Sequence, residues 1–167
     1  GLNIDFHRQL SDPELPVEVN IQAFNPLVPA DADASGLPVA ILRFVVKSKA
    51  SKEMTAAICG SLPNFIGTDG SQGKCQGNRN TFRRSDRLAG IYLTSEGVPD
   101  WAEQWGTLAL TTTATNTLIT HRTAWANRSW NGSLLDFWDD FSADGELEER
   151  GDEGASMPMA SLAVKFR

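Results

Sequence analysis

The stretch Pro16–Phe24, PVEVNIQAF, decides the fold class because its side chains alternate in character. Every second residue from Val17 to Ala23 is apolar, and each residue between them is polar. A period of two is typical of a β-strand with one buried face, because successive side chains of an extended chain point to opposite sides. We therefore predict a half-buried strand here and ask whether the rest of the chain supplies partners for it.

Further segments rich in apolar and β-branched residues predict more strands. They are Leu37–Lys49, Met54–Leu62, Arg87–Gly97, Trp105–Trp125 and Ala155–Arg167. The first of these is almost continuously apolar, which favours a central strand covered on both faces. The second follows it after a short polar turn, so we expect the two to form a hairpin.

Residues 63–87 break this pattern with four glycines and no periodicity. We expect a loop of 25 residues, which is long for a compact domain and therefore functional or partly disordered. The remaining six or seven strands, joined by turn-rich links, predict a mainly β fold. We expect one antiparallel β-sandwich domain over residues 1–167, of the supersandwich kind.

The acidic stretch Ser133–Glu149 is the one segment with a helical period. We predict a short amphipathic helix over residues 133–142, packed on the sandwich with its carboxylates facing water or another domain. Its apolar side is expected to comprise Leu134, Phe137, Trp138 and Phe141, and its polar side Asp136, Asp139 and Asp140. Asn131 and its neighbours are candidates for the N-cap, and Gly145 suits a left-handed C-terminal position.

Three kinds of chemistry compete with that structural interpretation of the acidic stretch. Residues 140–145 match the first half of an EF-hand loop, but Gly151 stands where the bidentate Glu belongs. Paired catalytic carboxylates need a raised pKa on one of them, and nothing in the pattern supplies it. A catalytic triad has only His7 and His121 to draw on, and no nucleophile elbow occurs. We predict no catalytic residue, no metal ligand and no cofactor.

The net charge of −6 is a local property of the chain. Residues 134–153 hold nine acids and one base, so 12 acids and 14 bases remain elsewhere. A basic cluster around Phe82 leaves single-stranded nucleic acid or an anionic protein surface open as partners, and we expect no nucleic acid. Cys59 and Cys75 are expected to be free thiols. No transmembrane run or signal peptide is visible, and the localisation stays open, with the cytoplasm slightly favoured.

The five tryptophans make carbohydrate binding a candidate function, because flat aromatic faces suit the apolar side of a sugar ring. Tryptophans also fill cores and interfaces. The candidate contacts to a carbohydrate or to another domain are Trp101, Trp105, Trp138, Arg79 and Arg83.

Several motifs resemble the amino-terminal region of glycoside hydrolase family 116, the family of non-lysosomal glucosylceramidases and β-glucosidases. The motifs most specific to it are PVEV at 16–19, AFNPLVP at 23–29 and SGLPVA at 35–40. Three others are suggestive, namely GSLPN at 60–64, WGTLAL at 105–110 and the block from Leu135 to Gly145. The resemblance extends from about residue 12 to residue 167.

This resemblance implies a two-domain retaining β-glycosidase in which the chain is the first domain, a β-sandwich. A helical second domain of the family carries the nucleophilic Glu and the acid/base Asp, so no catalytic role is carried over to a residue here. The expected partner is that catalytic domain of the same protein, and an open sheet edge also invites a homodimer. The leading hypothesis is a non-catalytic supporting domain. The alternatives are a carbohydrate-binding module that uses exposed Trp, and a stand-alone binding protein.

Overall fold

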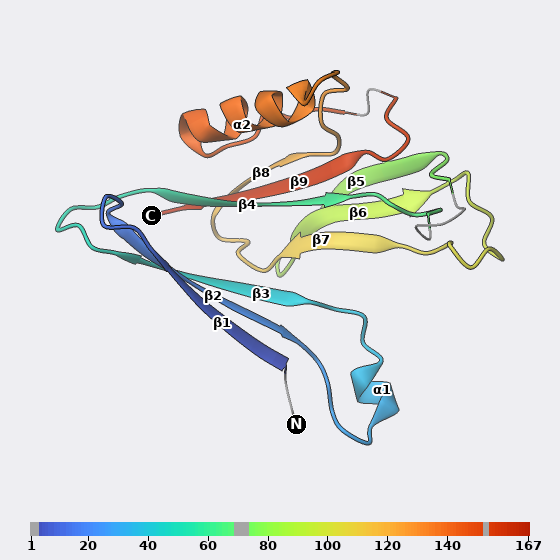
Figure 1. Ribbon diagram of the computed structural model, residues 1–167, viewed down its shortest axis with the longest axis horizontal. Helices are drawn as coiled ribbons and strands as arrows, with labels where there is room; N and C mark the ends of the chain where they lie inside the picture. Colours follow the sequence, from blue (N-terminus) through green and yellow to red (C-terminus); the bar gives the residue numbers. More distant parts are fainter. Residues whose placement is uncertain (1–3, 69–73, 152–153) are drawn as a thin grey trace. The chain divides into compact units, whose positions relative to one another are not determined.

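The computed structural model describes residues 4–68, 74–151 and 154–167 (Figure 1). Its contacts divide the chain into two compact units, Gly1–Met54 and Thr55–Arg167. Within the described ranges, no helix is long and apolar enough to cross a membrane. Antiparallel strands dominate, and a mainly β fold with one substantial helix is confirmed.

The first unit is a single antiparallel sheet with the order β1-β2-β3. Its elements are β1 (Ile4–Ser11), β2 (Val17–Asn25), the four-residue helix α1 (Ala32–Ser35) and β3 (Ile41–Ser48). The register sets Val19 between Leu10 and Val46, and Ile21 opposite Phe44, so one face of the sheet is apolar. The alternation in Pro16–Phe24 therefore does form a strand, at the centre of this sheet.

No described side chain of the first unit is buried. The apolar face remains accessible at Phe6, Leu10, Leu42 and Phe44. The prediction that Leu37–Lys49 is covered on both faces is therefore wrong. Its continuous apolar character instead reflects apolar residues on both sides of an edge strand.

The second unit contains two three-stranded antiparallel sheets, β4-β9-β8 and β5-β6-β7. Their strands are β4 (Ala56–Pro63), β5 (Asn78–Arg84), β6 (Ala89–Ser95), β7 (Leu108–Thr112), β8 (Leu118–Arg122) and β9 (Met159–Phe166). Ile91 and Leu93 of β6 pack with Ala160 of β9 to form the core of this unit. Contacts of β9 with β6 and β7 join the two sheets face to face, as in a sandwich.

Helix α2 (Gly132–Asp144) lies on the other face of the β4-β9-β8 sheet (Figure 1). Phe137 of the helix packs with Leu147 and Ala163, and this second cluster covers the face that β9 turns away from the core. Gly145 ends the helix with φ of 79°, which confirms its predicted role because L side chains rarely adopt that conformation. Asn131 is the N-cap residue, but its side chain makes no capping hydrogen bond.

One predicted pairing and one predicted loop are wrong. β4 pairs with β9 instead of β3, and β3 pairs with β2. Strand β5 lies inside the segment 63–87 that we expected to be a loop. Its sequence, NRNTFRR, is mostly polar and shows no apolar alternation that would predict a strand. Possible disorder within that loop falls partly on residues 69–73, which lie outside the described residues.

Candidate functional site

Arg122 at the end of β8 is completely buried and lies beneath α2. Its Nη1 donates to Asp136 Oδ2 at 2.9 Å, and its Nη2 lies 2.7 Å from Asp140 Oδ2. Its Nε donates to the Glu148 carbonyl at 3.1 Å. A guanidinium removed from water needs such charge-assisted partners, and the i, i+4 spacing of the two aspartates places both on one side of the helix. We call Arg122, Asp136 and Asp140 the helix clasp.

The two aspartates of the helix clasp also bind donors other than Arg122. Arg150 donates to Asp136 Oδ1 at 3.1 Å, and Asp140 Oδ2 accepts from the Glu148 backbone N–H at 3.0 Å. The prediction that the helix carboxylates face water is therefore wrong for Asp136 and Asp140, which face the sheet. Both are engaged by cations or backbone donors and serve to hold the helix in place.

The side of α2 that faces away from the sheet carries several large apolar side chains beside the exposed Asp139 and Ser142. It exposes Trp130, which precedes the helix and is 96% accessible, together with Leu134, Leu135 and Trp138, each more than half accessible. We call these four residues the outer face of α2. The expected packing of Leu134 and Trp138 on the sheet is wrong, and only Phe137 and Phe141 of the predicted apolar side pack there. The helix is rotated so that the aspartates reach Arg122.

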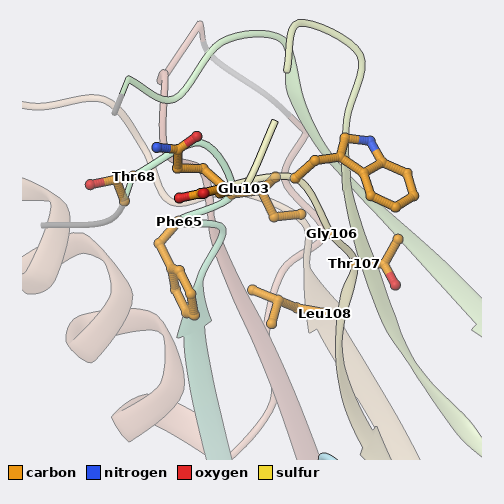
Figure 2. A pocket seen from close by; sticks show the side chains of 9 residues that line it. Phe65, Thr68, Glu103, Gly106, Thr107 and Leu108 are labelled. Atoms are coloured by element: carbon orange, nitrogen blue, oxygen red, sulfur yellow. The ribbon is translucent and has the colours of Figure 1, made fainter. Parts of the chain in front are cut away.

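A hollow of about 430 Å³ lies between the β4–β5 and β6–β7 connections (Figure 2). We call it the loop hollow. Residues that line it include Phe65, Thr68, Glu103, Gln104, Trp105 and Gly106. The backbone N–H of Gly67 donates to the Gln104 carbonyl at 3.2 Å and joins the two connections. The volume falls within the range of ordinary small-ligand sites, about 300–1,000 Å³.

Buried asparagines fix the connection that follows β4. Asn78 Nδ2 lies 2.9 Å from the carbonyls of both Asn64 and Ile66, and Asn64 Nδ2 lies 2.9 Å from the Thr94 carbonyl and 3.0 Å from Asn80 Oδ1. Side-chain amides thus supply hydrogen bonds to backbone carbonyls where the hydrogen bonds between strands end. This network positions the Phe65 side of the loop hollow.

A second hollow of about 250 Å³ lies on the face of β5, β6 and β7. Arg83 sets its guanidinium carbon 4.2 Å from the ring centroid of Tyr92, an accessible cation–π contact. Gly90 forms part of the lining, and a Cβ there would meet backbone atoms of Leu110 and Thr111 at 2.4 and 2.8 Å. Close strand packing therefore requires glycine at this position.

The five predicted contact residues lie on three separate elements. Trp101 and Trp105 share the β6–β7 connection, and of the two only Trp105 lines the loop hollow. Trp138 lies on the outer face of α2. Arg79 and Arg83 both lie on β5, where Arg79 pairs with Glu96 at 3.2 Å. Phe65, Glu103 and Arg122 were not singled out from the sequence, which carries no local signal for partners so distant along the chain.

Two titratable side chains are perturbed by burial. Desolvation raises the pKa of Cys59 to about 11, despite hydrogen bonds from Ser61 and from the backbone that act in the opposite direction. Desolvation lowers the pKa of His121, and the Glu149 carboxylate 3.8 Å away partly opposes it. His121 stacks on Phe82 with ring centroids 3.9 Å apart. Both predicted free thiols, Cys59 and Cys75, are free.

Among the described residues, no group of three or more His, Cys, Asp or Glu is arranged to hold a metal ion. A comparison with curated proteins found no match. A family model described as "beta-glucosidase 2, glycosyl-hydrolase family 116 N-term" matches residues 6–167. The chain belongs to this family. The resemblance seen in the sequence is thus confirmed, and it spans nearly the whole chain.

Three features stand out in this GH116 N-terminal domain. The helix clasp ties α2 to β8, the outer face of α2 is exposed and apolar, and the loop hollow combines aromatic with polar side chains. The family also implies a catalytic domain as a partner in a larger protein.

Proposed function

We propose that this chain is a non-catalytic supporting domain that docks on the catalytic domain of its own β-glucosidase through the outer face of α2. The observation that carries this proposal is the orientation of the helix, with Asp136 and Asp140 toward the sheet and Leu134, Leu135 and Trp138 toward solvent. Surface helices of globular proteins usually turn the opposite way.

The helix clasp makes this orientation costly to reverse. Rotating α2 to bury Trp138 would pull Asp136 and Asp140 away from Arg122 and leave a buried guanidinium without its carboxylate partners. Loss of one partner of a buried ion pair typically costs about 3–5 kcal/mol. The outer face of α2 is thereby held outward, ready for an apolar partner surface.

Two of the apolar side chains of this face are neighbours along the helix, since Leu134 and Trp138 are one helical turn apart. Trp130 lies in the turn just before the helix. Exposed apolar patches with polar rims are typical of protein–protein contacts, and Trp is enriched among the residues that dominate them. A permanently associated catalytic domain satisfies this requirement.

Isothermal titration of the chain with the separately produced catalytic domain tests the proposal. Leu135→Gln should weaken association markedly, because it places a polar group in the contact. Leu118→Gln serves as the control, since Leu118 is comparably exposed but lies on β8. Undetectable association of the unmodified chain, or equal loss with both variants, would refute the proposal.

A homodimer formed through open sheet edges is the competing arrangement. β1 and β3 are the edges of the first unit, and each offers unpaired backbone groups. Sedimentation of the chain alone at rising concentration distinguishes the two partners, because only the homodimer forms without the catalytic domain.

A further inference from the structure

We infer that the loop hollow binds the ring of a neutral sugar. This inference is independent of how α2 docks, since the loop hollow lies on the two connections described above and not on the helix. It rests on the side chains that line the hollow, on the hydrogen bonds that preform it and on the open space beside Gly106.

Two aromatic side chains give the loop hollow its apolar part. Phe65 and Trp105 are 42% and 47% accessible, so neither side chain is buried in a hydrophobic core. An aromatic face carries partial negative charge and attracts the weakly positive C–H groups on one side of a pyranose ring. Phe65 comes from the connection after β4 and Trp105 from the connection before β7, so a ring bound there would contact both connections.

Polar groups of the same hollow match the hydroxyls of a sugar. Glu103 supplies a carboxylate acceptor and Thr107 a hydroxyl (Figure 2). Such a mixture of few polar groups with aromatic surface is typical of small-ligand sites. No Lys or Arg appears among the lining residues of the described chain, and the charge of Glu103 disfavours an anionic ligand.

The hollow is preformed by its own backbone. Gly67 donates to Gln104, the Thr68 N–H donates to the Phe65 carbonyl at 3.1 Å, and the Trp105 N–H donates to the Ala102 carbonyl at 2.9 Å. Gly67 has φ of 95°, and a Cβ there would lie 2.5 Å from the Lys74 carbonyl oxygen. A preformed site loses little conformational entropy on binding, which suits a small ligand.

Gly106 provides the decisive variant. A Cβ added there meets no atom within 4 Å, and its backbone lies outside the left-handed region. Gly106 lines the loop hollow, so Gly106→Leu adds a large side chain to its wall at a point where a Cβ meets no other atom. Gly151→Leu is the matched control, since a Cβ at Gly151 also meets nothing within 4 Å and Gly151 does not line the hollow.

Saturation-transfer NMR with methyl β-glucopyranoside on the 167-residue chain tests the site. We expect saturable transfer to the ring protons, its loss in Gly106→Leu and its retention in Gly151→Leu, with equal thermal unfolding midpoints for both variants. No saturable transfer, or transfer that survives Gly106→Leu, would overturn the inference. Trp105→Ala is a second variant, expected to abolish transfer should Gly106→Leu lower the unfolding midpoint.

A charged analogue tests the chemistry of the hollow. Glucose 6-phosphate should bind roughly tenfold more weakly than the neutral glucoside, because the phosphate and the Glu103 carboxylate repel each other. Glu103→Gln should remove most of that difference while leaving ring contacts in place. Equal binding of both sugars by the unmodified chain would contradict the role of Glu103 and with it the neutral-ligand assignment. Neither experiment involves the catalytic domain, so its outcome is separate from that of the docking test.

Discussion

Arg122 is the residue on which the placement of α2 depends. Arg122→Met keeps most of the side-chain volume but leaves Asp136 and Asp140 beside an apolar group, so we expect a loss of about 3–5 kcal/mol in the free energy of unfolding. Urea denaturation measures it. Arg79→Met is the control, because the Arg79–Glu96 pair is largely exposed and such pairs contribute no more than about 1 kcal/mol. Similar losses in both variants would show that the helix clasp is not special.

Cys59 is expected to be a slowly reacting thiol. The thiolate is the reactive form, and burial raises the pKa of Cys59 to about 11. In a Cys75→Ser background, a thiol reagent at pH 8 should therefore label the folded chain far more slowly than the chain unfolded in urea. Equal rates in the two states would mean that the strand around Cys59 opens readily.

His121 should make stability depend on pH below neutrality. Its folded-state pKa is lowered by burial, so the folded chain binds fewer protons than the unfolded chain. Its contribution is fully present above the unfolded pKa of about 6.5 and is lost as pH falls through the folded pKa.

The comparison of His121→Phe with the unmodified chain isolates this effect. The variant keeps a ring to stack on Phe82 but cannot titrate, so its free energy of unfolding should fall less steeply between pH 7 and pH 5. Parallel pH profiles would assign the acid sensitivity to other groups.

At the scale of elements, α2 places two neighbouring residues in different surroundings, with Phe137 buried and Trp138 exposed. Phe137→Ala should cost about 3–5 kcal/mol, because Phe137 is buried against Leu147 and Ala163. Trp138→Ala should change the free energy of unfolding by less than about 0.5 kcal/mol, since Trp138 points to solvent. Thermal unfolding of the two variants checks both values. A reversed order would mean that the helix is rotated from the position described.

Sequence periodicity predicted the existence of α2 but not its rotation. Leu134, Leu135, Phe137, Trp138 and Phe141 form one broad apolar side of the helix, and the pattern does not say which part of that side packs on the sheet. We expected the whole aromatic side to pack on the sheet. A single buried arginine from β8, which no local pattern identifies, draws Asp136 and Asp140 inward, so only Phe137 and Phe141 of that side pack there. Strand β2 was predictable because alternation is a local property, and β5 was missed because its residues are mostly polar.

At the scale of the whole molecule, the two units differ in their capacity to fold alone. No described residue of the first unit is buried, while the second has two apolar clusters. A lone three-stranded sheet needs a covered face for stability. We expect residues 55–167 to unfold cooperatively as an isolated fragment and residues 1–54 to remain unfolded, as circular dichroism would show. A folded fragment 1–54 would contradict this.

The fold class could be predicted from the sequence, whereas the loop hollow could not. Alternation and β-branched runs predict which segments are extended, and the family resemblance predicts that these segments form a β-sandwich. The loop hollow joins Phe65 to Trp105 through hydrogen bonds between connections, and these depend on how strands pair. The pairing itself was partly mispredicted, since β4 joins β9 and not its neighbour in the chain.

β9 has a consequence for how the polypeptide is made. It forms the middle of its sheet, and Ser61 of β4 contacts Ser161 of β9 across 100 residues of intervening sequence. During synthesis β4 emerges from the ribosome long before β9 exists, so its edge stays without its native partner while translation continues. Conditions that slow elongation between these strands should lengthen that vulnerable interval and increase the demand for chaperones.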